Sequence, residues 1–325
     1  MTKKSSRKSV AKVPDSPPRT NMEKTMRGIQ RMIEGKEFGS IEDMNDFLAS
    51  HSSKGLIASL GRAGMTAKDK AQELAFDAME AASAAKARKL AQRALALDPD
   101  CVDALVVLTE INAPLAREAI DGLQKAVAAG ERSLGARFFR DNRGHFWGLL
   151  ETRPFMRAME QLGGLLRAEG RLPEAIRVYE RMLELNPNDN QGVRDLLLGL
   201  YLAVDELAGA AKLLRKYKED TLANFSWGRV LERLLAADEP GARAALVKAR
   251  KQNRFVEQYL CGQRRIPKEM PASFSPGSDE EATLCVETLA PVLVRHREAA
   301  LWLRDQCARG AAARISKAAP EERLQ

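Results

Sequence analysis

The chain has 325 residues, of which 45% are apolar, 5% aromatic and 30% charged, a composition that supports a sizeable core and, being rich in Ala and Leu, favours helix. Its longest uncharged apolar run has nine residues (196–204), too few for a membrane span, and its N-terminus lacks the apolar core of a signal peptide. Four dispersed cysteines and three histidines show no zinc-ligand spacing, so the sequence predicts a cytoplasmic protein with free thiols and no metal or other cofactor.

Most of the formal net charge of +8 lies in the first 20 residues. This segment has six basic residues against Asp15, a balance of +5, which leaves +3 for the other 305 residues. It is also rich in Ser and Pro, as disordered tails are. Two interpretations stay open: a solubilising terminus, or a contact for nucleic acid or an anionic membrane. A mitochondrial presequence is disfavoured by prolines at 14, 17 and 18, which break an amphipathic helix.

Residues 21–64 are predicted to form a helical hairpin followed by a flexible connection. The apolar residues of the first helix recur at helical spacing: Met22, Met26, Ile29 and Ile33. Glycines at 35 and 39 end this helix, and Ser40 followed by Asp43 is typical of an N-cap for a second, short helix. Three glycines between 55 and 64 predict the connection. The hairpin is expected to act as a docking arm.

The segment from Thr66 to Asp100 predicts a second, closely packed hairpin. Thr66 with Asp69 three residues later marks a helix start, and another helix is expected over 84–97. Pro99 closes the segment. Alanines at 87, 91 and 94 take the positions where the two helices would touch, so little but backbone and methyl groups separates them.

Residues 131–150 are interpreted as an insertion between a helix over 114–129 and the next repeat. Around it, aromatic and basic residues interleave: Arg137, Phe138, Phe139, Arg140, Arg143, His145, Phe146, Trp147, Arg153, Phe155 and Arg157. Such side chains can stack on bases, hold phosphates or anchor a peptide. The other interpretation is that the aromatic rings fill the interior and the arginines pair with Asp141 and Glu151.

Residues 156–189 fit the 34-residue helix-turn-helix pattern of a tetratricopeptide repeat. The matching residues are Leu162, Gly163, Gly170, Ala175, Tyr179 and Pro187. Small residues allow the helices to approach, a glycine serves the turn, and the proline stops the second helix. Met159 and Met182 depart from the pattern, which more often has Trp and Ala there. Asn188 and Asp189 are expected to cap the following helix.

Two more degenerate hairpins are predicted after this repeat, over 190–202 with 207–217 and over 222–236 with 242–252. A short helix (253–262) and a proline-rich loop (264–277) follow. Ser278 with Glu281 predicts a capping box for a last helix over 279–309, with a kink or break at Pro291. This helix is expected to cap the exposed apolar end of the repeats.

Several stretches resemble a mainly bacterial family of tetratricopeptide-repeat proteins without an established activity. They are residues 142–158 (NRGHFWGLLETRPFMRA), 185–198, 253–267 and 275–282. The resemblance spans about residues 21–305 and implies the fold and a binding role, without catalytic residues. Some members carry a C-terminal cysteine-rich metal-binding motif that this chain lacks, so no metal role is implied.

The predicted fold class is therefore all-α: a TPR-like solenoid with a 20-residue insertion and a C-terminal capping helix. The domain bounds expected from composition and motifs are a basic tail (1–20), the hairpin and linker (21–64), the solenoid (65–262), the loop and capping helix (263–309) and a frayed tail (310–325).

The predicted function is a non-catalytic scaffold that binds a protein or peptide in the concave groove lined by the first helix of each pair. The candidate partner-binding residues are Arg140, Asn142, His145, Trp147, Glu151, Arg153, Arg157, Glu160, Arg167, Gln191, Arg194 and Tyr201. No phosphate loop, nucleophile elbow or HExxH motif indicates an enzyme. The alternative is nucleic-acid or ribosome association through residues 1–20 and the Arg/aromatic stretch 137–157.

Overall fold

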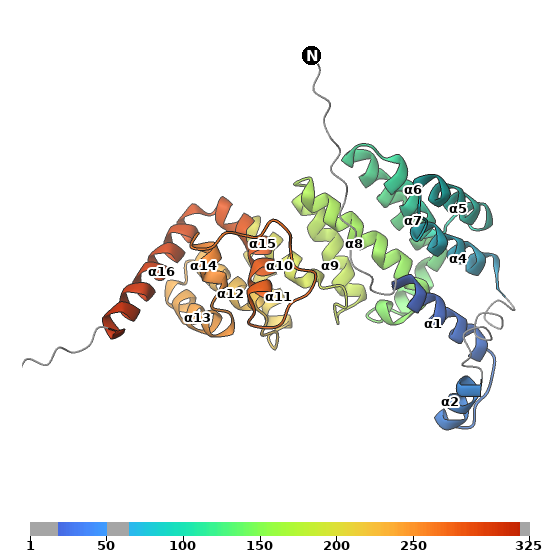
Figure 1. Cartoon of the computed structure of the whole chain (residues 1–325), viewed down its shortest axis with the longest axis horizontal. Helices are drawn as coiled ribbons and strands as arrows, with labels where there is room; N and C mark the ends of the chain where they lie inside the picture. The colour runs from blue at the N-terminus through green and yellow to red at the C-terminus, as the bar shows by residue number, and fades with distance from the viewer. Residues whose placement is uncertain (1–18, 51–64, 319–325) are drawn as a thin grey trace, which may run out of the picture. The chain divides into compact units, whose positions relative to one another are not determined.

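The computed structural model describes residues 19–50 and 65–318, and within these ranges every regular element is a helix (Figure 1). The predicted all-α class is confirmed, and helices that follow one another pack in pairs. None of these described helices is long and apolar enough to cross a membrane. The chain divides into two compact units, Met1–Gln161 and Leu162–Gln325. Residues 1–18 of the basic tail and the glycine-rich connection fall outside the described residues, whereas the last two tail residues, Arg19 and Thr20, begin α1.

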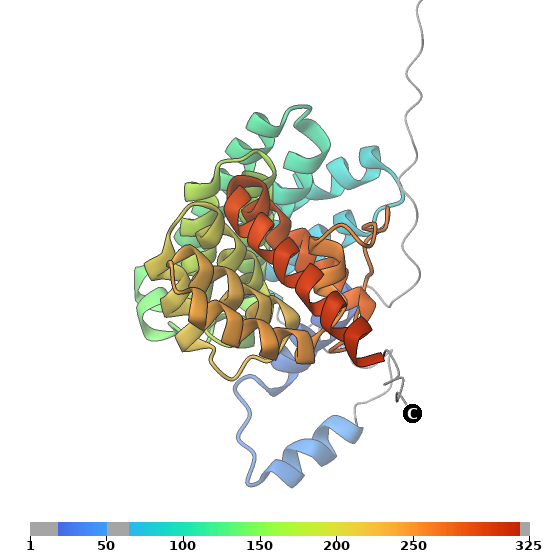
Figure 2. The same ribbon diagram turned by 90° about the vertical axis from the view of Figure 1, so that its left-hand side faces the viewer.

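The described helices of the first unit are α1 (Arg19–Ile33), α2 (Ile41–Ser50), α4 (Ala67–Met79), α5 (Ala84–Leu97), α6 (Val102–Asn112), α7 (Ala116–Asp141), the short 3₁₀ turns η1 (Phe146–Gly148) and η2 (Leu150–Thr152), and the start of α8 (Arg153–Ala168). Hairpins α4–α5 and α6–α7 are packed side by side. Helix α2 has no buried residue and stands apart from the others in Figures 1 and 2.

The hairpin of α4 and α5 has the features that the sequence predicted for residues 66–100. Thr66 caps α4 in a complete capping box with Asp69, and α5 has the predicted bounds. The three alanines at 87, 91 and 94 are buried, which brings α4 and α5 close together. Small residues at the contact therefore do here what the pattern predicted.

The predicted insertion is largely an extension of α7. This helix continues to Asp141, with a break at Gly135, whose φ is 79°, and the two 3₁₀ turns complete the segment. The rings of Phe138, Phe139, Phe146 and Phe155 pack on one another at centroid distances of 4.9–6.2 Å. Phe146 and Phe155 are buried and Phe138 and Phe139 are half-buried. The second interpretation of the stretch therefore holds for the packing of these rings and for the arginines near Asp141, and no ion pair joins Glu151 to an arginine among the described contacts.

The second unit begins within α8 and continues with α9 (Leu172–Leu185), α10 (Val193–Ala203), α11 (Leu207–Lys216), α12 (Ala223–Leu235), α13 (Glu239–Gln252), α14 (Val256–Leu260), α15 (Asp279–Arg295) and α16 (Arg297–Ala318). Gly170 adopts a φ of 71° at the predicted turn. A Cβ on Gly163 would lie 2.5 Å from the ring of Tyr179, so the small-residue slot is needed. Met182, which takes a position where the repeat pattern usually has alanine, is fully buried.

Two predicted helix boundaries are wrong, each for a local reason. Helix α10 starts at Val193, not at residue 190, because the Asp189 carboxylate accepts the amides of Val193 and Arg194 at 2.9 and 3.0 Å. Pro291 does not break the last helix. It lies on an exposed face of α15, where water can satisfy the carbonyl that lost its partner, and the break comes at His296 instead.

Helix α15, the first part of the predicted capping helix, packs along other helices of the second unit. It packs against α10 and α12, the first helices of two successive hairpins, as well as α14 and α16; in Figure 2, α16 crosses in front of this unit. At Gly199 a Cβ would lie 2.7 Å from the Thr288 carbonyl oxygen. Helix α15 therefore covers the side of α10 that carries Gly199.

Replacing Gly199 with alanine is expected to lower the free energy of unfolding by about 1–3 kcal/mol, because the added methyl meets backbone that cannot rotate away. The matched control is Gly164→Ala in α8, where a Cβ meets nothing within 4 Å. That change is expected to raise the free energy of unfolding by up to about 1 kcal/mol, because alanine has a higher helix propensity than glycine. Urea unfolding curves of both variants measure the difference; equal stabilisation by both would show that α15 is not packed against Gly199.

A buried carboxylate lies on the same helix. Asp195 of α10 has an unpaired, buried Oδ1, and burial, reinforced by the nearby Asp220 and opposed by Arg194, raises its pKa from 3.8 to about 6. The folded state therefore binds this proton more tightly than the unfolded chain does.

The Asp195 contribution to stability is expected to be present below about pH 4 and to be lost as the pH rises to about 6. We expect Asp195→Asn to raise the free energy of unfolding above pH 6 by about 2–3 kcal/mol, the value of a two-unit shift in pKa, and to change it little at pH 4. Denaturant unfolding of variant and wild type at pH 4, 5, 6 and 7.5 tests this. A difference that does not grow with pH would contradict it.

Candidate functional site

A row of carboxylates runs along one side of α4. Asp69, Glu73, Asp77 and Glu80 follow at intervals of four, four and three residues, which places them on one helix face. We call these four residues the α4 acidic row. Helix α4 is the first helix of its hairpin, and the sequence predicted that such first helices line a groove.

Helix α1 lies antiparallel along this row and meets it with cations. Lys24 Nζ lies 2.9 Å from Asp77 Oδ1 and 3.6 Å from a Glu80 carboxylate oxygen. Arg31 lies 3.5 Å from Asp69 and 3.8 Å from Glu73.

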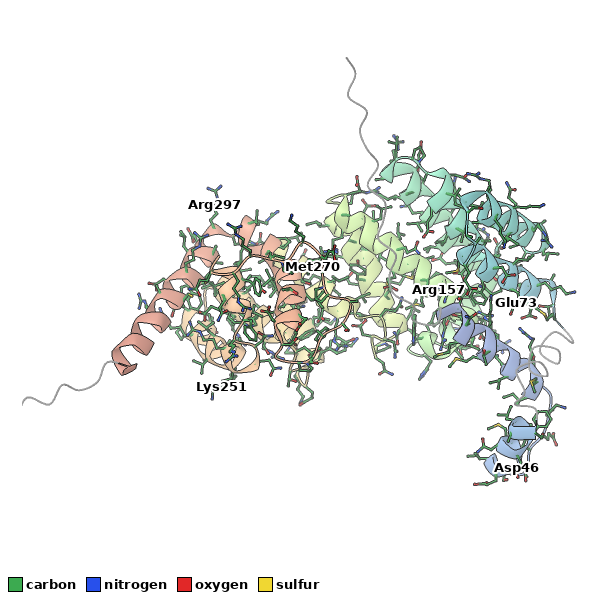
Figure 3. All side chains as sticks on the ribbon, viewed as in Figure 1. Asp46, Glu73, Arg157, Lys251, Met270 and Arg297 are labelled. Atoms are coloured by element: carbon green, nitrogen blue, oxygen red, sulfur yellow. The ribbon has the colours of Figure 1, made fainter. Side chains whose placement is uncertain are left out.

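Arg27, between these two on the same face of α1, donates to the Leu150 carbonyl oxygen at 2.6 Å. We call Lys24, Arg27 and Arg31 the α1 basic row. In Figure 3, Glu73 on α4 and Arg157 on α8 both lie beside α1. One basic helix therefore follows the whole acidic row and also reaches η2.

A buried charge cluster joins α1 to α6 and α8. The Arg157 guanidinium donates to Glu23 at 2.6 Å and to both carboxylate oxygens of Asp103 at 2.6 and 3.2 Å. Gln72 also donates to Asp103, at 2.7 Å. Glu23 is only 4% exposed and Asp103 only 2%. Burial lowers the pKa of Arg157, but the carboxylates of Asp103 and Glu23 outweigh it and raise that pKa, so the guanidinium stays charged.

The ring of Phe76 forms an apolar floor beneath these charges. Phe76 is fully buried on α4, and Lys24, Arg27 and Arg157 each place a cationic group 5.9–6.0 Å from its centroid. Cations at this distance are attracted by the ring's negative face. The ring is thus enclosed by cations, two of which come from α1.

The contacts of α1 with this face are mostly polar. Its Met22 and Met26, interpreted from the sequence as part of an apolar stripe, are 64% and 39% exposed, while Glu23 is buried. Burial raises the pKa of Glu73 despite the opposing influence of Lys24 and Arg31. The side of α1 that faces the protein carries these charges together with the buried Met32, which is 6% exposed, whereas Met22 and Met26 are exposed.

A cleft of about 340 Å³ lies next to this face. Its wall includes Arg27 of α1, Lys68 and Asp69 of α4, Phe138 of α7, and Glu151 at η2. Charges of both signs line it, and Lys68 already donates to the Ser133 hydroxyl at 3.2 Å. The cleft is therefore polar, like the contact between α1 and α4, and its lining does not favour a ligand of one charge sign.

The candidate residues of the Arg/aromatic segment are not brought into one site. Arg140 is exposed and lies 3.9 Å from Asp141, Asn142 ends α7 by donating to the Phe138 carbonyl, and His145 is exposed at the start of η1. Glu151 lines the cleft.

Two other residues of this segment do meet. The Arg153 guanidinium lies 5.6 Å from the centroid of the half-buried Trp147 ring and donates to the Trp147 carbonyl at 3.3 Å. These two contacts of Arg153 with Trp147 orient the turns η1 and η2.

The remaining candidates are divided between the two units. Arg157 and the exposed Glu160 lie on α8 in the first unit, and the half-buried Arg167 is on the same helix in the second. Gln191 is half-buried just before α10.

Two candidates on α10 do not face an open groove. Arg194 pairs with Asp220 at 2.8 Å and Asp189 at 3.5 Å, above the rings of Tyr217 and Phe225. Tyr201 packs on Gly209 of its own hairpin and donates to Glu180 at 2.6 Å. Both side chains serve the internal packing of the second unit.

Sequence reasoning missed the α4 acidic row and the α1 basic row, although both were readable as charges at helical spacing. As for other chemistry, no group of three metal-ligating side chains gathers within the described ranges. Burial raises the pKa of the Cys101 thiol, which lies beside the cleft, to about 12, so it is not poised as a nucleophile.

Comparison with known proteins adds no identity. No protein-family model matches the chain, and no curated protein matches its sequence.

Proposed function

We propose that the protein is a non-catalytic scaffold that binds another protein on the face of its first unit formed by α4, α6 and the start of α8. In this proposal the hairpins α4–α5 and α6–α7, and α10–α11 and α12–α13, are TPR-like repeats, and their first helices line the binding side.

The observation that carries the proposal is a difference between two packed helices: α15, which lies on α10 in the second unit, and α1, which lies on α4 in the first. Helix α15 meets α10 at backbone contact distance at Gly199, and its Glu281 is buried in hydrogen bonds to neighbouring segments. Helix α1 instead meets α4 through ion pairs of long side chains. Water and salt compete with such pairs, which contribute up to about 1 kcal/mol each when partly exposed. The first unit therefore offers the face that a partner can reach.

The nucleic-acid alternative gains no support from the Arg/aromatic segment. Phe146 and Phe155 are buried among other rings, whereas base stacking needs exposed rings. Of the arginines that are exposed there, Arg137 and Arg140 both lie near Asp141. We therefore favour a protein partner.

A photo-crosslinking amino acid placed at Met79, exposed at the end of α4, tests the proposal in the full chain. The control position is Val247, exposed on α13 of the second unit. In a lysate of the source cell, we expect a discrete protein adduct at position 79 that is absent at 247 and resists nuclease. Adducts that disappear with nuclease, or equal adducts at both positions, would contradict the proposed binding face.

A further inference from the structure

We propose that the ligand of this face is a basic helix of a partner protein, with Lys or Arg at positions i, i+3 and i+7 behind a Glu at i−1, and that α1 occupies its place in cis until the partner displaces it. The inference rests on the proposed function for the location of the site. It adds the chemistry of the ligand and the way access is regulated.

The α1 helix shows what the face selects. Its cations at 24, 27 and 31 meet Asp77, a backbone carbonyl and the Asp69–Glu73 pair in turn, and Glu23 meets Arg157. The spacing i−1, i, i+3, i+7 is read directly from these contacts. An acidic segment would instead place like charges against the α4 acidic row at every step.

The spacing of these contacts also requires the ligand to be helical. A step of seven residues along α1, from Lys24 to Arg31, matches a step of eight residues along α4, from Asp77 back to Asp69. Two helices with the same rise stay in step over this length of about 10 Å. An extended strand would cover about 23 Å with the same seven residues. Its cations would overrun the row.

The face needs an occupant of this kind when α1 leaves. Without α1, the ring of Phe76 loses two of its three cationic neighbours and becomes uncovered on that side. Arg157 keeps its bidentate contact with Asp103 but loses Glu23. A basic helix with a leading Glu restores all of these contacts.

The chain allows α1 to leave without unfolding its neighbours. The 33 residues between Ile33 and Ala67 separate α1 from α4, long enough for α1 to move off the face while α4 stays packed on α5 and α6. A partner helix must therefore replace the partly exposed ion pairs of α1 with α4, which salt weakens, and also the buried contacts of Glu23 and Met32.

The test is a reciprocal charge swap in the full chain. The probe is a fluorescent peptide with the sequence of residues 19–33, and its binding is followed by anisotropy. Variant one carries Lys24→Glu, Arg27→Glu and Arg31→Glu, which frees the face. It is expected to bind the peptide at least about tenfold more tightly than wild type does, because the competing occupant is gone, with affinity falling steeply as salt is added.

Variant two carries Glu73→Lys and Asp77→Lys, which also frees α1 but reverses the face. It is expected to lose the basic peptide and to bind a peptide in which positions 24, 27 and 31 are Glu. A peptide with the same composition but shuffled spacing should bind neither variant. Circular dichroism and thermal melting establish that both variants remain folded; if either does not, the single substitutions Arg31→Glu and Glu73→Lys replace them in the same measurements.

The inference is overturned if folded variant one binds the native and shuffled peptides equally or binds neither. It is also overturned if variant one and wild type differ only in a concentration-dependent dimer in sedimentation experiments, because the occupant is then a second copy of the chain. If variant one does not bind the peptide but the protein adduct at position 79 is still found, the proposed ligand is wrong and the proposed binding face is retained.

Discussion

Arg157→Met is expected to destabilise the first unit by about 3–5 kcal/mol, the usual cost of removing one partner from a buried ion pair. The loss is large because Asp103 and Glu23 are almost fully buried and would keep charges without a counter-ion. Trp147 is the only tryptophan in residues 1–161, and its neighbour Arg153 lies four residues before Arg157. Denaturant unfolding followed by Trp147 fluorescence, with Trp227 and Trp302 replaced by Phe in every protein compared, measures the change.

The matched control combines Arg157→Met with Glu23→Gln and Asp103→Asn. With the charges removed together, most of the loss is expected to be recovered, since a neutral buried cluster has no unpaired charge to desolvate. If the triple variant is as unstable as the single one, the loss comes from packing around the side chain and not from its charge.

Glu281→Ala is expected to destabilise the second unit by about 3 kcal/mol. The carboxylate accepts the amide of Ala223 at 2.9 Å, the Asn253 side chain at 3.0 Å and the amide of Gly277 at 2.6 Å. Helix α12 has no side-chain cap of its own at Leu222, so Glu281 caps it from α15. Alanine leaves the buried amide of Ala223 and the half-buried amide of Gly277 without this acceptor, and Asn253 keeps only its bond to the Ser278 carbonyl; each lost acceptor of a buried donor costs about 1–3 kcal/mol.

Glu281→Gln is the control for this change. It keeps one acceptor oxygen and nearly the same volume, so its loss is expected to be less than half that of alanine. Urea unfolding of the two variants, followed by the fluorescence of Trp227 and Trp302, compares them. Equal losses would show that the charge of Glu281, and not its acceptor geometry, holds α15 in place.

The sequence predicted the features that depend on neighbours along the chain. The cap at Thr66, the alanine contact of α4 with α5 and the fit of Gly163 to Tyr179 are set by residues within one hairpin. At Ser278 the prediction was half right. Its hydroxyl does cap α15, but the Glu281 side chain binds Gly277, Asn253 and Ala223 instead of completing the capping box.

Contacts between distant segments could not be predicted in the same way. The position of α15 depends on Gly199 meeting Thr288, 89 residues later, and periodicity within a helix does not say which other helix covers it. The face of α1 was misjudged because Met22 and Met26 suggested a buried stripe, whereas both are exposed. Comparing the charge spacing of Lys24, Arg27 and Arg31 with that of α4 would have found the contact.

Hydrogen–deuterium exchange of the full chain tests the central claim most directly, because it measures how often each covering helix opens. An isolated helix of 15 residues is marginal in water, so the amides of α1 exchange whenever it leaves α4. We expect the amides in the middle of α1 to exchange at least about 100-fold faster than those in the middle of α15, and to exchange faster still at high salt. Equal protection of α1 and α15, unchanged by salt, would contradict the account.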